Sequence, residues 1–209
     1  MYLKVIKNIC VFAGVNIVGM YCYIQYKKKS SGPKLNIVLD LDETIIHTDN
    51  IVKINDLNMS NALKSNNNIC SNSNPILLRA VWIRPWVETL LPIMSDFNNV
   101  YLFTKAKKSY ADNIIKKINM DKYFTNKKYR EDCEGTCKDM KKFNLDLENS
   151  ILVDDRLSNR CEIQHFYHIP QFNHYVKYDW EFMKLFWYII WVNIQNDIKK
   201  IENEIKNKT

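Results

Sequence analysis

The sequence predicts an α/β protein with a doubly wound, mostly parallel sheet. Three short apolar runs carry this prediction: Leu35–Leu41, Val100–Thr104 and Ile151–Asp155. They are rich in β-branched and aromatic residues and lack strict alternation, which is typical of strands buried on both faces. Helical patterns lie between them, and strands that alternate with helices indicate this class of fold.

The chain begins with an uncharged, mostly apolar segment, Asn8–Tyr26, with lysines on both sides. Its length approaches the roughly 20 residues that a transmembrane helix needs. A targeting segment and a buried helix are the alternatives. We expect a single-pass membrane anchor, and the lysines after it favour a cytosolic main domain. A soluble cytoplasmic or nuclear protein is the alternative localisation.

The remaining elements follow in order. Ser30–Pro33 has the turn chemistry of a linker. Residues 49–75 are polar and Asn-rich, which indicates a small surface insertion, with a strand expected at Ile51–Ile54. We therefore expect an apolar segment and linker over residues 1–30, one domain over residues 31–196 and a polar helical tail over residues 197–209.

Apolar residues recur at helical spacing in three places. One pattern includes Val87, Leu90, Leu91 and Met94, and a second includes Ala111, Ile114, Ile115 and Ile118. A long helix is expected over Asp179–Lys208. Its apolar centre, Leu185–Val192, is too short to cross a membrane.

Composition narrows the class of partner. The formal net charge is +7, which suits an anionic partner such as phosphorylated protein. The basic residues are scattered, so we expect no direct nucleic-acid binding. The six cysteines are irregularly spaced, which favours reduced thiols. Zinc binding by Cys133 and Cys137 with His165 and His168 is disfavoured, because their spacing fits structural zinc patterns poorly.

Each apolar run ends in reactive polar side chains: Asp40 and Asp42, then Thr104, then Asp154 and Asp155. Ligands of open α/β sheets bind at the carboxyl ends of strands, so these groups should converge. Close carboxylates repel by about 4 kcal/mol per pair at intermediate dielectric. A hard cation such as Mg²⁺ removes that cost and neutralises a phosphoryl group. One carboxylate can then attack phosphorus while another transfers protons.

The segment Leu39–Thr44 (LDLDET) matches the DxDx[TV] signature of phosphatases of the haloacid-dehalogenase superfamily. It resembles the branch that dephosphorylates the C-terminal domain (CTD) of RNA polymerase II, which includes the small CTD phosphatases and NLI-interacting-factor-like proteins. Further segments match that branch in the same order: Arg84–Leu91 its RPG-x-x-x-FL segment, Tyr101–Ala111 its hhhT…YA segment, Tyr129–Cys133 its YRE-x-C segment, Cys137–Met140 its KDL segment and Val153–Asp155 its acidic metal motif.

The resemblance implies a role for each site residue. Asp40 is expected to be the nucleophile and a metal ligand. Asp42 is expected to be the general acid and base, with its backbone carbonyl on the metal. Thr44 and Thr104 are expected to hold phosphate oxygens.

The remaining roles belong to a lysine and two acidic residues. Lys138 is expected to neutralise the phosphoryl charge and the aspartyl-phosphate. Asp155 is the expected direct metal ligand, and Asp154 either orients the lysine or supports the metal shell. The expected cofactor is Mg²⁺. For Arg130, a contact with the substrate and an ion pair within the protein are the two alternatives. His47 is interpreted as a structural residue.

Two positions depart from the branch. Trp86 stands where a glycine is expected, and Arg156-Leu157 follow the acidic motif in place of Ser-Pro or Asn-Ser. The expected function is dephosphorylation of phosphoserine or phosphothreonine in protein through an aspartyl-phosphate. The alternative is a non-catalytic, membrane-anchored binding module similar to the mitochondrial import receptor of the same superfamily. A small-metabolite phosphatase usually carries a large cap, and the insertion over residues 49–75 is too short for one.

Overall fold

The structure is a computed structural model that describes residues 18–30, 32–50, 69–70, 79–161, 164–176 and 178–207. The chain divides into two compact units, Met1–Lys34 and Leu35–Thr209, and residues 18–29 of the first are helical. The strand expected at Ile51–Ile54 and residues 8–17 of the expected anchor lie outside the described residues. Across the ranges that are described, the structure contains no helix with the length and apolarity of a membrane span. The anchor therefore stays a prediction.

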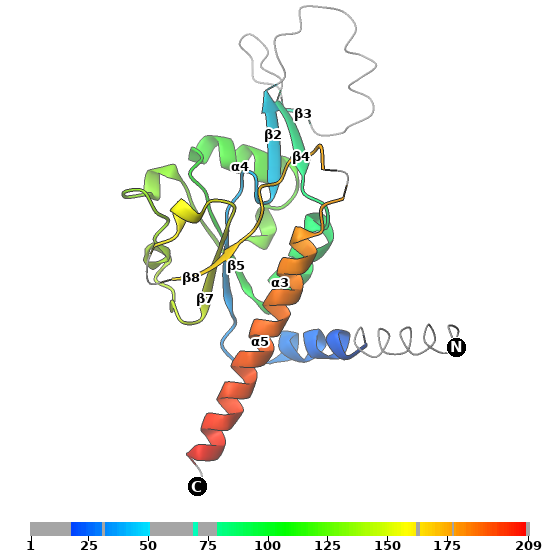
Figure 1. Ribbon diagram of the computed structural model, residues 1–209, viewed down its shortest axis with the longest axis vertical. Coiled ribbons are helices and arrows are strands. Elements are labelled where there is room, and N and C mark those ends of the chain that lie inside the picture. The colour runs from blue at the N-terminus through cyan, green and yellow to red at the C-terminus, as the bar shows by residue number, and fades with distance from the viewer. Residues whose placement is uncertain are drawn as a thin grey trace, which may run out of the picture. The chain divides into compact units, whose positions relative to one another are not determined.

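A five-stranded sheet forms the centre of the second unit, with the order β6-β5-β1-β7-β8 (Figure 1). The strands are β1 Asn36–Leu39, β5 Asn99–Phe103, β6 Asn126–Lys128, β7 Ser150–Asp154 and β8 His165–His168. All four neighbouring pairs are parallel. The chain adds strands on one side of β1 and then on the other, so the predicted doubly wound α/β class is confirmed.

Apolar side chains cover both faces of this sheet. On one face, Val38 and Leu152 pack with Met140 and Phe143 of the short helix η3 (Met140–Phe143). On the other face, the ring of Tyr167 in β8 lies 4.8 Å from that of Tyr188 in the C-terminal helix. Burial on both faces explains why the central strands read as continuous apolar runs.

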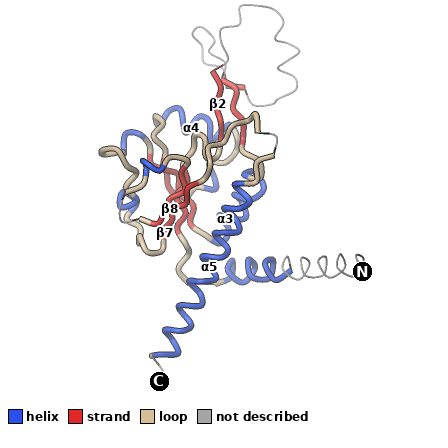
Figure 2. The backbone as a smooth tube through the Cα atoms, viewed as in Figure 1, coloured by secondary structure: helices blue, strands red, loops and turns tan. Residues whose placement is uncertain are grey.

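The helices lie where helical spacing predicts them, although their ends differ by a few residues (Figure 2). They are α3 Val87–Phe97, α4 Lys108–Lys117 and α5 Glu181–Lys206. At the end of α3, Asn98 accepts a buried 2.9 Å hydrogen bond from Asn193 of α5. Three further short helices are η1 Asp121–Tyr123, η2 Arg130–Asp132 and η4 Leu157–Asn159.

A small antiparallel sheet follows the end of β1, with the order β2-β4-β3. Its strands are β2 Ile46–Asn50, β3 Ile69–Cys70 and β4 Arg79–Ile83. Residues 51–68 and 71–75 of the insertion, and residues 76–78 after it, lie outside the described residues. In the part that is described, a three-stranded sheet takes the place of a large cap.

Trp86 occupies a left-handed backbone conformation, with φ 72°, directly before α3. A non-glycine residue in this conformation costs roughly 1–2 kcal/mol, which explains the glycine of the related pattern. The ring of Trp86 lies 5.1 Å from that of Trp180, and this contact offsets part of the cost.

The expectation that all cysteines are reduced is wrong for one pair, because Cys137 and Cys161 form a disulfide. Their Cα atoms lie 5.5 Å apart, which is within the usual span of a disulfide. The fold creates this proximity across 24 residues, so sequence spacing could not reveal it. The disulfide also removes Cys137 from the zinc set that the sequence disfavoured.

Candidate active site

The carboxyl ends of the central strands bring four of the predicted residues to one open pocket: Asp40, Asp42, Thr104 and Lys138 all line it. Asp40 follows β1, Thr104 follows β5, and Lys138 precedes η3. Asp154 is the last residue of β7, and Asp155 follows it. Thr44 lies in the turn between β1 and β2, where its side chain is buried.

Lys138 is the electrostatic centre of the site. Its Nζ lies 2.6 Å from Asp40 Oδ1 and 2.6 Å from Asp154 Oδ2, and the residue is 0% exposed. Its backbone N–H donates to the carbonyl of Asn159 at 2.8 Å, which fixes the segment that carries it. The lysine therefore holds the carboxylate of Asp40 in place from inside the protein.

Asp154 and Asp155 have different surroundings. Besides Lys138, the carboxylate of Asp154 accepts from Asn159 Nδ2 at 2.9 and 3.0 Å and from the Arg156 backbone N–H at 2.8 Å. Most of the hydrogen-bond acceptor capacity of the Asp154 carboxylate is therefore occupied by protein donors. The side chain of Asp155 is only 4% exposed, yet its buried Oδ1 has no hydrogen-bond partner among the described residues. This geometry favours Asp154 as the residue that orients the lysine and leaves Asp155 with a free oxygen.

Burial controls the charges of this group. Burial raises the pKa of Asp40 to about 7, although Lys138 acts in the opposite direction. Burial opposes the charge of Lys138, but Asp40 and Asp154 outweigh it and raise the pKa of the lysine. Burial and the neighbouring Asp154 raise the pKa of Asp155 as well. The site therefore concentrates negative charge that a cation would relieve.

We expect the metal-free protein to lose stability as pH rises from about 4 to about 7. Unfolded Asp40 ionises near its ordinary pKa of 3.8, while the folded form keeps its proton up to about pH 7. The folded state binds more protons in this window, so the unfolding free energy falls as pH rises. Urea denaturation in EDTA at several pH values measures this. Asp40→Asn should remove this part of the slope, and equal slopes for both proteins would contradict the assignment.

Asp42 has a partner that sequence reasoning missed. The hydroxyl of Tyr110 in α4 donates to Asp42 Oδ1 at 2.8 Å and lies 3.2 Å from Thr48 Oγ1 in β2. The tyrosine belongs to a segment that matches the related branch, although no role was predicted for it. Its position indicates that it orients the carboxylate expected to transfer protons.

Tyr110→Phe is expected to lower kcat about tenfold with little change in KM, since a hydrogen bond to a charged group contributes roughly 1.5–3 kcal/mol. Steady-state hydrolysis of para-nitrophenyl phosphate measures both constants. Tyr123→Phe, which removes a hydroxyl elsewhere on the domain, is the matched control. Equal kcat values for Tyr110→Phe and the wild type would rule out this positioning role.

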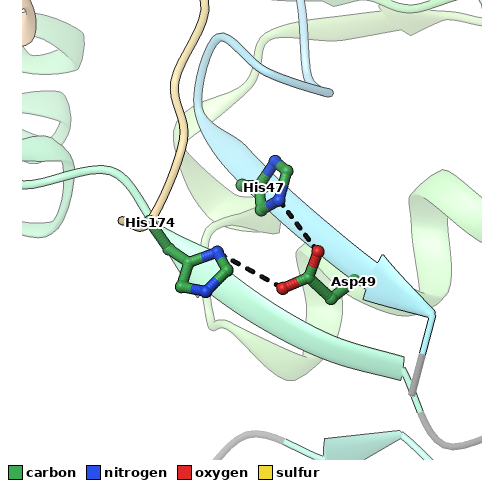
Figure 3. Close-up of side chains that lie close together, drawn as sticks. All are labelled: His47, Asp49 and His174. Carbon is green, nitrogen blue, oxygen red and sulfur yellow. Dashed lines mark hydrogen bonds and ion pairs between the residues drawn. The ribbon is translucent and has the colours of Figure 1, made fainter. Parts of the chain in front are cut away.

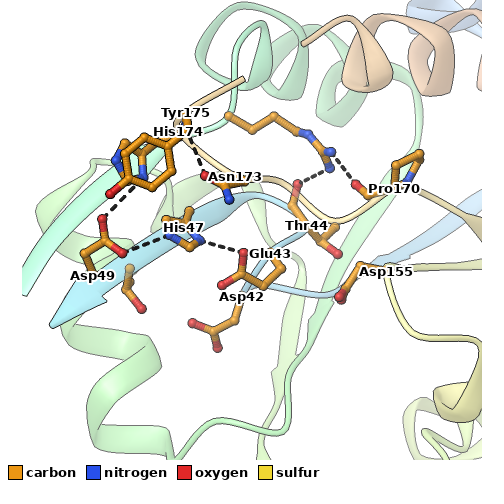
Figure 4. A network of polar contacts seen from close by, with 12 residues as sticks. Asp42, Glu43, Thr44, His47, Asp49, Asp155, Pro170, Asn173, His174 and Tyr175 are labelled. Atoms are coloured by element: carbon orange, nitrogen blue, oxygen red, sulfur yellow. Dashed lines mark hydrogen bonds and ion pairs between the residues drawn. The ribbon is translucent and has the colours of Figure 1, made fainter. Parts of the chain in front are cut away.

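Arg84 supports the turn that carries Thr44. Arg84 is only 1% exposed. Its guanidinium donates to Asp179 Oδ2 at 3.0 Å, to the backbone carbonyl of Thr44 at 2.9 Å and to that of Pro170. Figure 4 shows Thr44 and Pro170 in this network. The backbone N–H of Phe172 also donates to the carbonyl of Glu43 at 2.6 Å. The turn after Asp42 is thus held from several directions.

Basic side chains of Lys105, Arg130 and Arg156 line the pocket beside the carboxylates. Arg130 Nε donates to the backbone carbonyl of Lys105 at 2.7 Å, and its side chain is exposed. Lys105 Nζ donates to Asn159 Oδ1 at 2.7 Å. Thr104 Oγ1 accepts from the backbone N–H of Ala106 at 3.0 Å, so this hydroxyl is fixed at the pocket wall.

A parallel sheet whose central strand ends in two aspartates, with a buried lysine against the first, defines a domain of the haloacid-dehalogenase type. Residues 35–199 match the family described as NLI interacting factor-like phosphatase, and the chain belongs to that family.

The chain is similar to curated relatives over part of their length. It is 26% identical to CTD small phosphatase-like protein 2 of Dictyostelium discoideum over 132 residues, which are 61% of this chain and 22% of that protein. It is 29% identical to nuclear envelope morphology protein 1 of Schizosaccharomyces pombe over 131 residues, 59% of this chain and 26% of the relative. The chain thus spans well under half the length of these relatives.

Two solved structures share the fold. Both are of Fcp1, described as an RNA polymerase II CTD phosphatase: a fission yeast form bound to beryllium fluoride and a second Fcp1 structure. Their TM-scores are 0.52 and 0.53 at 17% and 19% identity, and each match covers 74% of this chain and 45% of the other. At these identities the likeness shows the architecture alone.

Proposed function

We propose that the chain is a Mg²⁺-dependent phosphatase that acts on phosphoserine or phosphothreonine in protein through an aspartyl-phosphate. The observation that carries this proposal is the pairing at the pocket floor. The Asp40 carboxylate lines the pocket, and a buried lysine holds it at 2.6 Å. A fixed carboxylate in this position suits nucleophilic attack on phosphorus.

The acidic residues fit a magnesium ion. One carboxylate oxygen from each of Asp40, Asp154 and Asp155 lies within 4.8 Å of the others, and the buried Oδ1 of Asp155 lacks a hydrogen-bond partner among the described residues. Hard oxygen ligands of this kind are those that Mg²⁺ prefers. Asp40, Asp155 and the backbone carbonyl of Asp42 would hold the ion, with Asp154 behind them. The ion would supply charge neutralisation for the phosphoryl oxygens.

The protein groups perform the two chemical steps. Asp40 forms a bond to phosphorus while the bond to the leaving serine or threonine oxygen breaks, and Asp42 gives that oxygen a proton. Asp42 then takes a proton from water, which attacks the aspartyl-phosphate and releases phosphate. Lys138 balances the charge of the transferred group, and the hydroxyls of Thr44 and Thr104 hold its oxygens. Thr44 is 0% exposed and lies outside the pocket lining, so its role rests on the family resemblance, with a buried Oγ1 that has no hydrogen-bond partner among the described residues.

The pocket supports a protein substrate for two reasons. Among the described residues, the insertion beside the pocket is a three-stranded sheet and the carboxylates line an open pocket, which is compatible with approach by a segment of another protein. The cationic side chains of Lys105, Arg130 and Arg156 line the same pocket and suit acidic or phosphorylated residues that flank the reacting one.

The test compares phosphoserine, phosphothreonine and phosphotyrosine peptides with para-nitrophenyl phosphate, using the full chain with Mg²⁺ or EDTA. We expect Mg²⁺-dependent turnover, with kcat/KM highest for the phosphoserine and phosphothreonine peptides. Arg130→Ala should weaken peptide hydrolysis while leaving that of the small ester unchanged. Absence of turnover on every substrate would contradict the proposal and favour a binding module.

A further inference from the structure

A second group of metal-ligand side chains lies on the small sheet beside the turn after β1. It consists of His47 and Asp49, on the same face of β2, and His174 from the segment between β8 and α5 (Figure 3). One potential ligand atom from each lies within 4.8 Å of the others. The side chains of His47 and His174 are 15% and 13% exposed, and that of Asp49 is 38% exposed. Two imidazoles thus meet one carboxylate at a half-buried position.

The separations suit a small divalent ion. His47 Nε2 lies 3.1 Å from Asp49 Oδ1, and His174 Nδ1 lies 3.3 Å from Asp49 Oδ2. Bonds of about 2.0–2.1 Å in a tetrahedral zinc site place neighbouring ligand atoms about 3.3 Å apart. Each histidine therefore faces one oxygen of the carboxylate at a distance compatible with a coordination shell, and for His47 also with the hydrogen bond that it makes there.

Glu43 supplies the outer support that metal-binding histidines usually have. Its Oε2 lies 2.6 Å from Nδ1 of His47, on the ring edge that faces away from Asp49. A metal-ligating histidine almost always uses its second nitrogen to donate to a carboxylate or carbonyl. A proton on Nδ1 leaves a lone pair on Nε2 pointing at the Asp49 carboxylate. A cation or a further proton must then separate these two groups.

His174 provides an independent observation. Its Nδ1 is buried and makes no hydrogen bond within the described part of the chain, although Asp49 Oδ2 is 3.3 Å away. The ring is held in place by a parallel stack on Trp82, with centroids 4.6 Å apart, and by Tyr175 at 3.9 Å. Figure 4 shows the contacts that run from His174 to Asp49, from Asp49 to His47 and from His47 to Glu43. Nδ1 of His174 is at ion-pair distance from Asp49 but lacks a hydrogen bond among the described residues, and a cation between the two groups would satisfy both.

We propose that His47, Asp49 and His174 bind a divalent transition-metal ion, with Zn²⁺ as the first choice and one coordination position open to solvent. Two imidazoles and a carboxylate suit zinc, whereas magnesium prefers oxygen ligands only. The ion would join β2 to the segment around residue 174, far along the chain. Because Glu43 lies between Asp42 and Thr44, the ion would also brace the turn of the candidate active site.

The experiment measures metal binding directly, on the full chain after EDTA treatment and with excess Mg²⁺ to occupy the other carboxylates. We expect one Zn²⁺ per chain from equilibrium dialysis and a tetrahedral Co²⁺ absorption spectrum. His174→Ala should abolish both. Glu43→Gln, which keeps the three ligands, should weaken Zn²⁺ binding roughly 10- to 100-fold. Asp49→Asn is the second ligand variant in case His174→Ala fails to fold.

The controls separate this proposal from the others. His165→Ala and His168→Ala remove exposed histidines of β8 and should leave Zn²⁺ binding unchanged. Asp40→Asn should also retain it, so the metal proposal stands or falls independently of the proposed phosphatase activity. Absence of stoichiometric Zn²⁺ or Co²⁺ binding, or equal binding by His174→Ala and His165→Ala, would overturn the proposal. The cluster would then be a histidine–aspartate hydrogen-bond network only.

Discussion

Asp40→Asn is expected to lower kcat by about 10⁴-fold or more, since the proposed mechanism loses its covalent nucleophile. The amide has nearly the same shape as the carboxylate but cannot form the bond to phosphorus. The Asn side chain at position 40 is neutral, so its burial carries no cost for a buried negative charge, and we expect the protein to stay folded. Hydrolysis of para-nitrophenyl phosphate at saturating substrate and Mg²⁺ measures the effect, beside circular dichroism for the fold.

Asp146→Asn is the matched control, because it makes the same chemical change at an exposed aspartate outside the pocket lining. Its kcat should equal that of the wild type. Turnover by Asp40→Asn at a rate similar to the control would exclude Asp40 as the nucleophile. A phosphorylated protein intermediate trapped in the wild type and absent from Asp40→Asn would add direct support for the covalent step.

Arg84→Met is expected to reduce the unfolding free energy by about 3–5 kcal/mol, the usual cost of removing one partner of a buried ion pair. The substitution leaves the carboxylate of Asp179 buried without its guanidinium, which meets it at 3.0 Å. It also removes the donors to the carbonyls of Thr44 and Pro170. Urea denaturation measures the loss.

A double-mutant cycle with Asp179→Leu separates the two contributions to that loss. Arg84→Met with Asp179→Leu replaces both charges by apolar groups and should recover part of the lost stability. The unsatisfied backbone carbonyls should keep the double variant less stable than the wild type. A loss below about 1 kcal/mol for Arg84→Met would show that this arginine is not the support that its contacts indicate.

The sequence predicted the central sheet because the signal for a buried strand is local. β1 lies within its predicted apolar run, and β5 and β7 each begin one residue before theirs. The reactive residues at the ends of these strands meet as the topology requires. The small sheet was predicted less well: the strand expected at Ile51–Ile54 lies outside the described residues, and β2 spans Ile46–Asn50, where no strand was expected. This strand is mostly polar, and its pairing with β4 defines it rather than its own composition.

Other features depend on contacts that a linear pattern does not contain. The different surroundings of Asp154 and Asp155 follow from Asn159 and Lys138, which arrive from other segments. The bond between Tyr110 and Asp42 joins residues 68 positions apart. His47 was interpreted as structural, and only its approach to His174 raises the question of metal binding. In contrast, Trp86 was visible as a departure from the family pattern, and the left-handed backbone gives its physical meaning.

Because of the disulfide, the stability and activity of a preparation should depend on whether it was kept under reducing conditions. Cys137 directly precedes Lys138, and Cys161 lies two residues beyond Asn159. The disulfide therefore links the segment that carries Lys138 to the segment that follows β7. A disulfide that closes a loop of this length lowers the conformational entropy of the unfolded chain, which stabilises the folded state by roughly 3 kcal/mol. Dithiothreitol in a storage buffer would remove that stabilisation. Preparations that were exposed to different reducing agents can therefore differ in the state of this disulfide. Their activities should be compared only after the free thiols in each have been counted.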